Sequence, residues 1–114
     1  MNDEVIVVRK AHSLEAVQEH VQKEMLSLVY ISQPGCSVCH SLLPQVEELL
    51  EEYPRVYPLH VDSEDVKEIA GEYTVFTVPV VMLFSEGKEL LRMARFIPIG
   101  DLNQELAKYN HLIQ

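Results

Sequence analysis

The spacing of hydrophobic and polar residues along this 114-residue chain changes several times, and each change marks a new element. Short runs of apolar and β-branched residues predict strands, and apolar residues at helical spacing between polar ones predict amphipathic helices. The expected strands cover residues 5–8, 26–32, 56–61, 80–84 and 89–96. The expected helices cover residues 14–25, 36–53, 63–73 and 102–113. This alternation predicts an α/β fold, with a mixed central β-sheet and helices on both of its faces.

Residues that cap, kink or end an element refine these boundaries. Ser13 is a good N-cap for the first helix, because its hydroxyl can accept a hydrogen bond from a free backbone N–H. Pro44 removes one backbone hydrogen bond and should kink the second helix, which Pro54 should end. Pro58 predicts that its strand begins late or lies near the edge of the sheet. The short turn at residues 85–88 predicts an antiparallel hairpin.

Composition and charge narrow the classes of function. The chain is long enough for one domain over residues 1–114, and 47% of its residues are hydrophobic. It has 18 acidic and 9 basic residues, a net charge of −9, so neither nucleic acid nor an anionic membrane is an expected partner. The apolar run at residues 5–8 is too short for a signal peptide, and no run has the length of a membrane span. We therefore expect a cytoplasmic protein, and we expect it to be a monomer.

Both cysteines of the chain lie where a predicted strand is followed by a predicted helix, in Cys36-Ser37-Val38-Cys39. Two cysteines are too few for a disulfide-built scaffold, and in the cytoplasm such a pair is more often catalytic or metal-binding. The free N–H groups and partial positive charge at a helix N-terminus lower the pKa of a thiol placed there. We expect Cys36, at or just before the helix start, to be the exposed nucleophile. Cys39, one turn further, should be buried and able to resolve a mixed disulfide.

The chain resembles the thioredoxin family over nearly its whole length. The resemblance rests on the strand, the Cys36–Cys39 motif and the helix, on Pro44 five residues later, on Thr77-Val78-Pro79 before an apolar strand, and on the hairpin turn at residues 85–88. It implies a thioredoxin fold and a thiol–disulfide oxidoreductase that reduces protein disulfides. It implies no cofactor beyond the redox-active disulfide itself. A separate reductase or a low-molecular-weight thiol would restore the pair.

The resemblance also assigns roles beyond the two cysteines. In the family, the proline that matches Pro79 follows a cis peptide bond and lies against the active-site sulfurs. The backbone of the preceding residue, here Val78, pairs with the bound substrate chain. We therefore expect Val78 and Pro79, together with Gly35 beside the first cysteine, to contact the substrate.

Several positions depart from the usual sequence of the family. Typical thioredoxins carry Trp-Cys-Gly-Pro-Cys, but Gly35 precedes the first cysteine here and the chain has no tryptophan, so the docking surface must differ. Tyr30 occupies the position of a buried aspartate, and Pro58 that of its paired lysine. The proton acceptor for Cys39 must then be water or a nearby histidine. The glycine often found after the last strand is replaced around residues 95–97.

Four residues around the pair are expected to tune the two thiols. Ser37 and Val38 lie between the cysteines and influence the reduction potential. A protonated His40 would lower the pKa of Cys36 through its positive charge. Tyr30 is the fourth, because it replaces the family's aspartate.

Three alternatives compete with disulfide reduction. The stretch from Cys36 to His40 formally matches the haem c attachment pattern, but covalent haem attachment normally needs export to an assembly compartment. The cysteines could bind a metal, but a closed zinc or iron–sulfur site needs four ligands and there is no second CxxC, so no metal site is assigned. His60 alternates with apolar neighbours, which favours a half-buried strand residue over a ligand. The third alternative is a thioredoxin-like binding or chaperone-type module with little turnover, which the missing tryptophan and aspartate favour.

Overall fold

A five-stranded mixed sheet forms the centre of the computed structural model, which describes residues 8–112. The elements in chain order are β1 (Arg9–Ala11), α1 (Leu14–Lys23), β2 (Ser27–Ser32), α2 (Ser37–Leu50), β3 (Tyr57–Asp62), α3 (Glu68–Tyr73), β4 (Val80–Ser85), β5 (Lys88–Ala94) and α4 (Ile99–Leu112). The strands lie in the order β1-β3-β2-β4-β5. Strands β1, β3 and β2 are parallel, whereas β4 is antiparallel to both β2 and β5.

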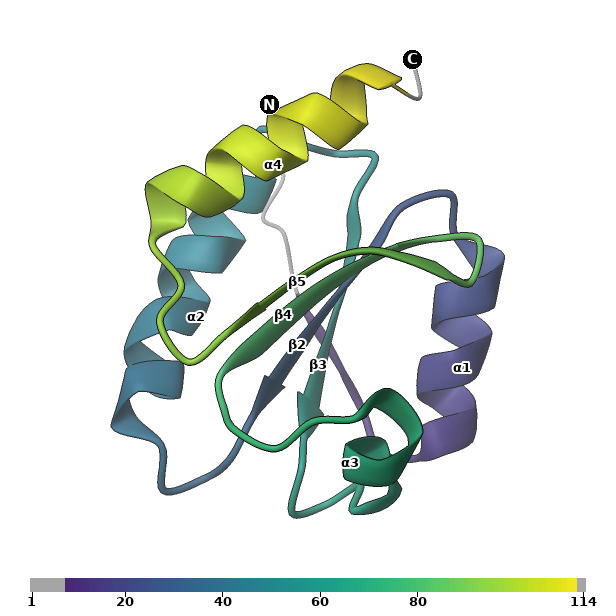
Figure 1. Cartoon of the computed structure of the whole chain (residues 1–114), viewed down its shortest axis with the longest axis vertical. Helices are drawn as coiled ribbons and strands as arrows, with labels where there is room; N and C mark the ends of the chain where they lie inside the picture. Colours follow the sequence, from purple (N-terminus) through teal and green to yellow (C-terminus); the bar gives the residue numbers. More distant parts are fainter. Residues whose placement is uncertain (1–7, 113–114) are drawn as a thin grey trace, which may run out of the picture.

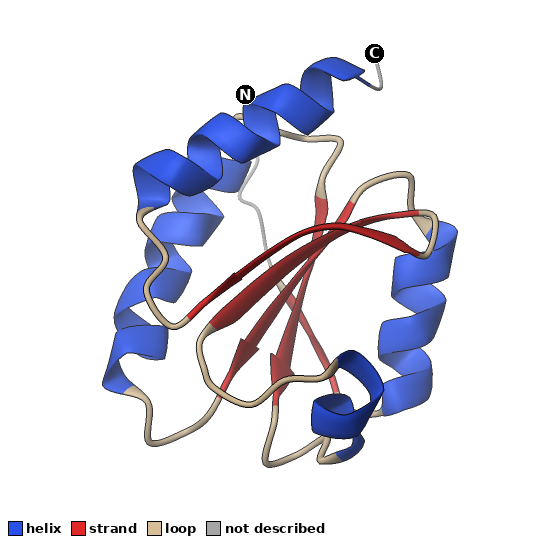
Figure 2. Cartoon of the chain, viewed as in Figure 1, coloured by secondary structure: helices blue, strands red, loops and turns tan. Residues whose placement is uncertain are grey.

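The helices cover both faces of this sheet, as the sequence predicts. Helices α2 and α4 lie on one face, and α1 and α3 lie on the other (Figures 1 and 2). Successive residues of a strand point to opposite faces, so β2 supplies side chains to two separate cores. Leu28 and Tyr30 belong to the core under α2 and α4, whereas Val29 and Ile31 belong to the core under α1. The strand before the two cysteines is therefore anchored on both sides.

Two local predictions are confirmed by hydrogen bonds and backbone geometry. The Ser13 hydroxyl caps α1 by accepting a hydrogen bond from the backbone N–H of Ala16 at 3.1 Å. Strands β4 and β5 form an antiparallel hairpin, and both residues at its tip, Glu86 and Gly87, have positive φ angles. Pro44 lies inside α2, and the helix continues past it to Leu50.

Several predicted boundaries differ from those of the structure, and three of them have a clear account. Residues 5–7 of the first expected strand lie outside the described residues, and the strand that the structure describes starts later, at Arg9. The third helix begins at Glu68, not at residue 63, because the Asp62 carboxylate and carbonyl instead bind the N–H groups of a turn that follows β3. Helix α2 ends at Leu50, before Pro54, in a turn closed by the Tyr53 N–H and the Leu50 carbonyl.

Pro58 lies near the start of β3, which is the second strand of the sheet, next to the edge strand β1, in agreement with the prediction of a strand near the edge. The strand pairs with β1 on one side and with β2 on the other. The Tyr57 N–H donates to the Leu26 carbonyl on the β2 side, so the nitrogen of the next residue, Pro58, faces β1. The described pairing with β1 starts only at Leu59. The missing N–H of the proline therefore falls before the first described pair of the β1–β3 ladder.

Candidate redox site

The two cysteines lie at the start of α2 and are joined by a disulfide. Cys36 is the N-cap of the helix, with extended backbone angles, and Cys39 lies in the first turn. Two intervening residues bring their Cα atoms to 5.3 Å, and the sulfurs are bonded. The Cys36 sulfur also accepts a hydrogen bond from the Cys39 backbone N–H at 3.2 Å. A sulfur in this position receives both a helical N–H and the partial positive charge of the helix N-terminus.

The two sulfur-bearing side chains differ in exposure. Cys36 is partly exposed, whereas Cys39 is buried against the sheet. The residues around Cys36, namely Gly35, Ser37 and Val38, are all exposed. An incoming disulfide can therefore reach the first cysteine but not the second.

His40 follows the second cysteine and turns back toward the loop that precedes the first. Its side chain is exposed, and its Nε2 donates to the Pro34 carbonyl at 2.9 Å. The bond ties the first turn of α2 to the Gln33–Gly35 segment. His40 is thus part of the same surface as Cys36.

The predicted substrate-contact residues Val78 and Pro79 lie just before β4, beside the end of β2. Ile31 of β2 pairs with Val80 of β4, so the residues just before Val80 lie beside the end of the strand that leads to Cys36. The Val78–Pro79 peptide bond is cis, and Pro79 is buried while Val78 is partly exposed. The topology therefore brings the CxxC loop and the Val78-Pro79 segment to the same end of the sheet.

The loop after β5 joins them there. The Arg95 N–H donates to the Pro79 carbonyl at 2.8 Å, and Arg95 has a φ of 68°, in the left-handed region that favours glycine. The family often keeps a glycine in this segment, and Arg95 adopts the left-handed conformation here with a side chain. Sequence reasoning placed the substitution but did not predict this hydrogen bond.

Tyr30 is buried below the disulfide, at the position where the family usually has an aspartate. Its hydroxyl donates to the backbone carbonyl of Cys39 at 2.6 Å. Burial raises the pKa of Tyr30 to about 12, so the phenol stays protonated at neutral pH. Tyr30 can therefore position the first turn of α2, but it cannot accept a proton from Cys39 in neutral solution.

His60 and Ser32 complete a polar cluster on the same face of the sheet. His60 pairs with Tyr30 in the β2–β3 register, their ring centroids are 5.6 Å apart, and His60 Nε2 lies 2.6 Å from the Ser32 hydroxyl. Burial lowers the pKa of His60 below its ordinary value, and the positive charge of Lys10 lowers it further against the opposing effect of Asp62. The sequence predicted a half-buried strand residue. The contact between His60 and Tyr30 could not be predicted without the register of β2 against β3.

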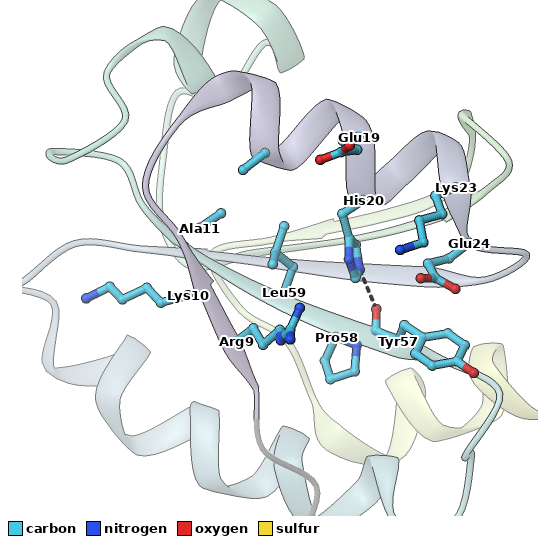
Figure 3. Close-up of a pocket in the computed structure, with 11 residues that line it drawn as sticks. Arg9, Lys10, Ala11, Glu19, His20, Lys23, Glu24, Tyr57, Pro58 and Leu59 are labelled. Carbon is cyan, nitrogen blue, oxygen red and sulfur yellow. Dashed lines mark hydrogen bonds between the residues drawn. The ribbon is translucent and has the colours of Figure 1, made fainter.

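A pocket of about 590 Å³ lies elsewhere, between α1 and strands β1 and β3, and contains neither cysteine (Figure 3). Its charged lining includes Arg9, Lys23 and Glu24, and His20 Nε2 donates across it to the Tyr57 carbonyl at 3.0 Å. Tyr57 lies at the start of β3, whereas the cysteines follow the end of the parallel strand β2. The redox pair therefore lies at the opposite end of these strands from the pocket.

Two further findings concern metals and membranes. Within residues 8–112, no group of three His, Cys, Asp or Glu side chains is placed to hold a metal ion. In the same part of the chain, none of the helices combines the length and the apolar character that crossing a membrane requires.

Comparison with known proteins identifies the family. The sequence pattern of the family described as Thioredoxin matches residues 6–108. The chain is 42% identical over 103 residues to the thioredoxin-like protein YdfQ of Bacillus subtilis (strain 168), which covers 90% of this chain and 92% of that protein. It is 29% identical over 93 residues to a thioredoxin of Pyropia yezoensis, and the match covers 81% of this chain and 87% of that protein. The crystal structure of thioredoxin from Trypanosoma brucei brucei is similar with a TM-score of 0.85 at 22% identity, and 96% of each chain is covered.

The chain belongs to the thioredoxin family. The match extends over most of its length, and the five-stranded mixed sheet with helices on both faces confirms the predicted thioredoxin fold. With the Cys36–Cys39 pair bonded at the start of α2, the chain is a thiol–disulfide oxidoreductase whose redox-active centre is this CxxC.

Proposed function

We propose that this oxidoreductase reduces protein disulfides in the cytoplasm, with Cys36 as nucleophile and Cys39 as resolving residue. The observation that carries the proposal is the unequal exposure of the pair, because a partly exposed Cys36 caps α2 while Cys39 is buried. Only the exposed sulfur can meet a disulfide on another protein. The helix N-terminus stabilises its thiolate and so supplies the attacking species.

The proposed reaction transfers two electrons to the substrate in two exchange steps. The Cys36 thiolate attacks one sulfur of the substrate disulfide, and the other substrate sulfur leaves as a thiolate that takes up a proton. Cys39 then loses its proton and attacks the Cys36 sulfur, which releases the second substrate thiol and leaves the Cys36–Cys39 disulfide. A separate reductase or a low-molecular-weight thiol returns two electrons and two protons to the pair. No other cofactor takes part.

Proton transfer from Cys39 must work without a buried carboxylate at position 30. Tyr30 donates to the Cys39 carbonyl and stays protonated, so it leaves the thiol proton to water or to a histidine. His60 is the nearest such group to Tyr30 by ring contact, and its lowered pKa keeps it neutral and able to accept a proton. His40, on the exposed side, would favour the Cys36 thiolate when protonated.

The proposed substrate path follows the backbone beside the disulfide. Val78 is partly exposed next to buried Pro79, and an extended substrate chain would pair with the Val78 backbone while its sulfur reaches Cys36. Gly35, exposed on the other side of the cysteine, carries no side chain to block this approach. Ser37 and Val38 lie on the same surface and would set the potential together with the local charge.

Reduction of insulin disulfides tests the proposal. We expect the wild-type chain, with dithiothreitol as reductant, to accelerate insulin precipitation. Cys36→Ser should abolish the acceleration, whereas Cys39→Ser should accumulate a covalent complex with insulin through Cys36, visible as a reducible adduct by mass spectrometry. If Cys36→Ser also forms the adduct, or if Cys39→Ser is the variant that cannot form it, the assigned roles are wrong.

A binding module with little turnover is the second candidate, and one observation favours it. The side chain at position 30 is a protonated phenol and not a base, which would slow the resolving step. Under this alternative the wild-type chain would itself accumulate the adduct that we expect only from Cys39→Ser. Rapid release of reduced insulin by the wild type would exclude it.

A further inference from the structure

Phe76 and Phe96 are the two most exposed large hydrophobic side chains in the part of the chain that the structure describes. Their exposed fractions are 85% and 82%, and that of Val38, between the cysteines, is 58%. Leaving an aromatic ring in water forgoes the free energy that burial would release. Phe76 and Phe96 come from two separate loops and Val38 from the first turn of α2, so their exposure does not follow from one poorly packed segment.

The topology brings these three segments to one end of the sheet. Val80 pairs with Ile31 of β2 and with Ala94 of β5, so the start of β4 adjoins the ends of both neighbours. Phe76 precedes β4, Phe96 follows β5, and Val38 follows β2. Figure 1 shows the β2–α2, α3–β4 and β5–α4 connections at this end of the sheet.

Hydrogen bonding fixes one of these residues relative to the redox site. The Arg95 N–H donates to the Pro79 carbonyl at 2.8 Å, and the next N–H, of Phe96, donates to the Ala94 carbonyl at 2.8 Å. These bonds hold the start of the β5–α4 loop against the Val78-Pro79 segment. The Phe96 side chain nevertheless remains exposed, so the loop is ordered while its aromatic ring has no partner within the described chain.

Other exposed apolar residues lie away from this end and provide a comparison. Met25 and Tyr57, exposed by 54% and 48%, lie near Ser27, which pairs with both Tyr57 and Phe84 at the other end of β2. They are less exposed than the two phenylalanines and have no relation to the cysteines. Met25 therefore offers a matched control for effects of removing surface hydrophobicity.

We propose that Phe76 and Phe96, with Val38, form an apolar rim that selects protein disulfides flanked by bulky apolar side chains. The inference rests on the proposed function, because a protein whose sulfur reaches Cys36 must cover this end of the sheet. The chain lacks the tryptophan that typically precedes the first cysteine, so apolar contact with a substrate has to come from other positions. Two exposed rings supply it, one two residues before Val78 in the chain and one in the loop that is hydrogen-bonded to Pro79.

The test measures selectivity, not only rate. Two disulfide-linked peptides are compared that differ only in the residues flanking the cysteine, leucine in one and serine in the other, with hydroxyethyl disulfide as a substrate without side chains. We expect wild-type kcat/KM to be roughly tenfold higher for the leucine peptide. In the double variant Phe76→Ser/Phe96→Ser this ratio should fall to within about twofold of unity, while reduction of hydroxyethyl disulfide is unchanged. Met25→Ser should keep the wild-type ratio.

Other results would overturn the inference. Equal wild-type rates on both peptides, or a double variant that keeps the wild-type ratio while all its rates fall, would show that the rings do not select substrates. If the wild type sediments as a dimer and the double variant as a monomer with unchanged selectivity, a second copy of the chain covers the rim. If the wild type reduces hydroxyethyl disulfide but neither peptide, reduction of protein disulfides fails as well; loss of the leucine preference alone leaves that function intact.

Discussion

Tyr30 replaces an ionisable acid with a hydrogen-bond donor directly below the redox pair. Its buried hydroxyl donates to the Cys39 carbonyl, and burial raises its pKa to about 12. We expect Tyr30→Phe to lower the free energy of unfolding by about 1 kcal/mol, because it removes one buried hydrogen bond and leaves the ring in place. The pH profile of disulfide reduction between pH 6 and pH 9 should shift by less than roughly 0.3 pH units, because a phenol with that pKa does not titrate in this range.

Denaturant unfolding of oxidised protein measures the first effect, and a stopped-assay pH series measures the second. Tyr57→Phe, which removes a hydroxyl from an exposed tyrosine in β3, is the matched control and should change stability by less than about 0.5 kcal/mol. A pH profile displaced in Tyr30→Phe alone would mean that the phenol does take part in proton transfer.

His60 should make the stability of the fold depend on pH. Its pKa is lower in the folded chain than the ordinary 6.5, chiefly because burial disfavours the charged ring. The unfolded chain therefore binds the proton more readily, so the stability that neutral His60 contributes is present above about pH 6.5 and is lost as the pH falls from there toward the folded-state pKa. We expect His60→Asn to flatten this decline in denaturant midpoints measured across that window.

A matched variant separates this effect from general acid denaturation. His111→Asn removes an exposed histidine of α4 and should retain the wild-type decline. A wild-type midpoint that does not fall on acidification, or that falls equally in His60→Asn, would contradict the assignment.

For single residues, the sequence could predict which side chains take part in the redox chemistry but not every contact between them. The spacing of Cys36 and Cys39 at a strand–helix junction predicted the buried and exposed positions that the structure shows. The Ser32–His60 hydrogen bond and the ring contact of His60 with Tyr30 depend on the register of β2 against β3. Two parallel strands separated by a helix carry no local signal for that register.

The β4–β5 hairpin shows how one element depends on backbone conformation at two residues. Glu86 and Gly87 have φ angles of 48° and 90°, and their N–H groups donate to the Glu24 and Val21 carbonyls at the end of α1. Glutamate is unfavourable at such an angle, whereas asparagine tolerates it. We expect Glu86→Asn to raise the free energy of unfolding by about 0.5–1 kcal/mol in denaturant titrations.

Gly87→Ala is the opposing substitution at the same turn. A Cβ at this position would lie 2.7 Å from Gln22 Nε2, and the positive φ disfavours any L side chain. The same titrations should show a loss of about 1–2 kcal/mol. In the double variant Gln22→Ala/Gly87→Ala, the stability should recover only by the part of the loss that the Cβ contact with Gln22 causes. If Gly87→Ala left the free energy of unfolding unchanged, the positive φ angle would not disfavour a side chain at this position.

Periodicity predicted most elements, and the errors have identifiable causes. Apolar spacing indicated α1, α2 and α4 because each has a sustained stripe on one face. Helix α3 was predicted too long, because Val66 and Ile69 are buried at helical spacing although Val66 belongs to the preceding turn. Buried residues three positions apart in an irregular segment give the same sequence pattern as a helix. Only the backbone hydrogen bonds distinguish the irregular segment from the helix.

The whole molecule places its redox chemistry at one end of its sheet. The end of β2, the start of β4 and the end of β5 are neighbours, so three sequence-distant loops lie at the end of the sheet that carries Cys36. The order of strands and helices was predictable because parallel connections constrain topology strongly. Which loops meet around Cys36 followed from that topology, whereas the exposure of Phe76 and Phe96 required the packed structure.

A redox equilibrium of the purified chain tests the central claim most directly. The protein is equilibrated in buffers of defined oxidised and reduced dithiothreitol, its free thiols are alkylated, and the adducts are counted by mass. We expect one reversible transition between zero and two alkylated cysteines, with a midpoint near the roughly −270 mV of thioredoxin. A chain whose Cys36 and Cys39 never form an internal disulfide across these buffers would contradict the exchange mechanism. A midpoint near the roughly −120 mV of a strong oxidant would contradict its assignment as a reductant.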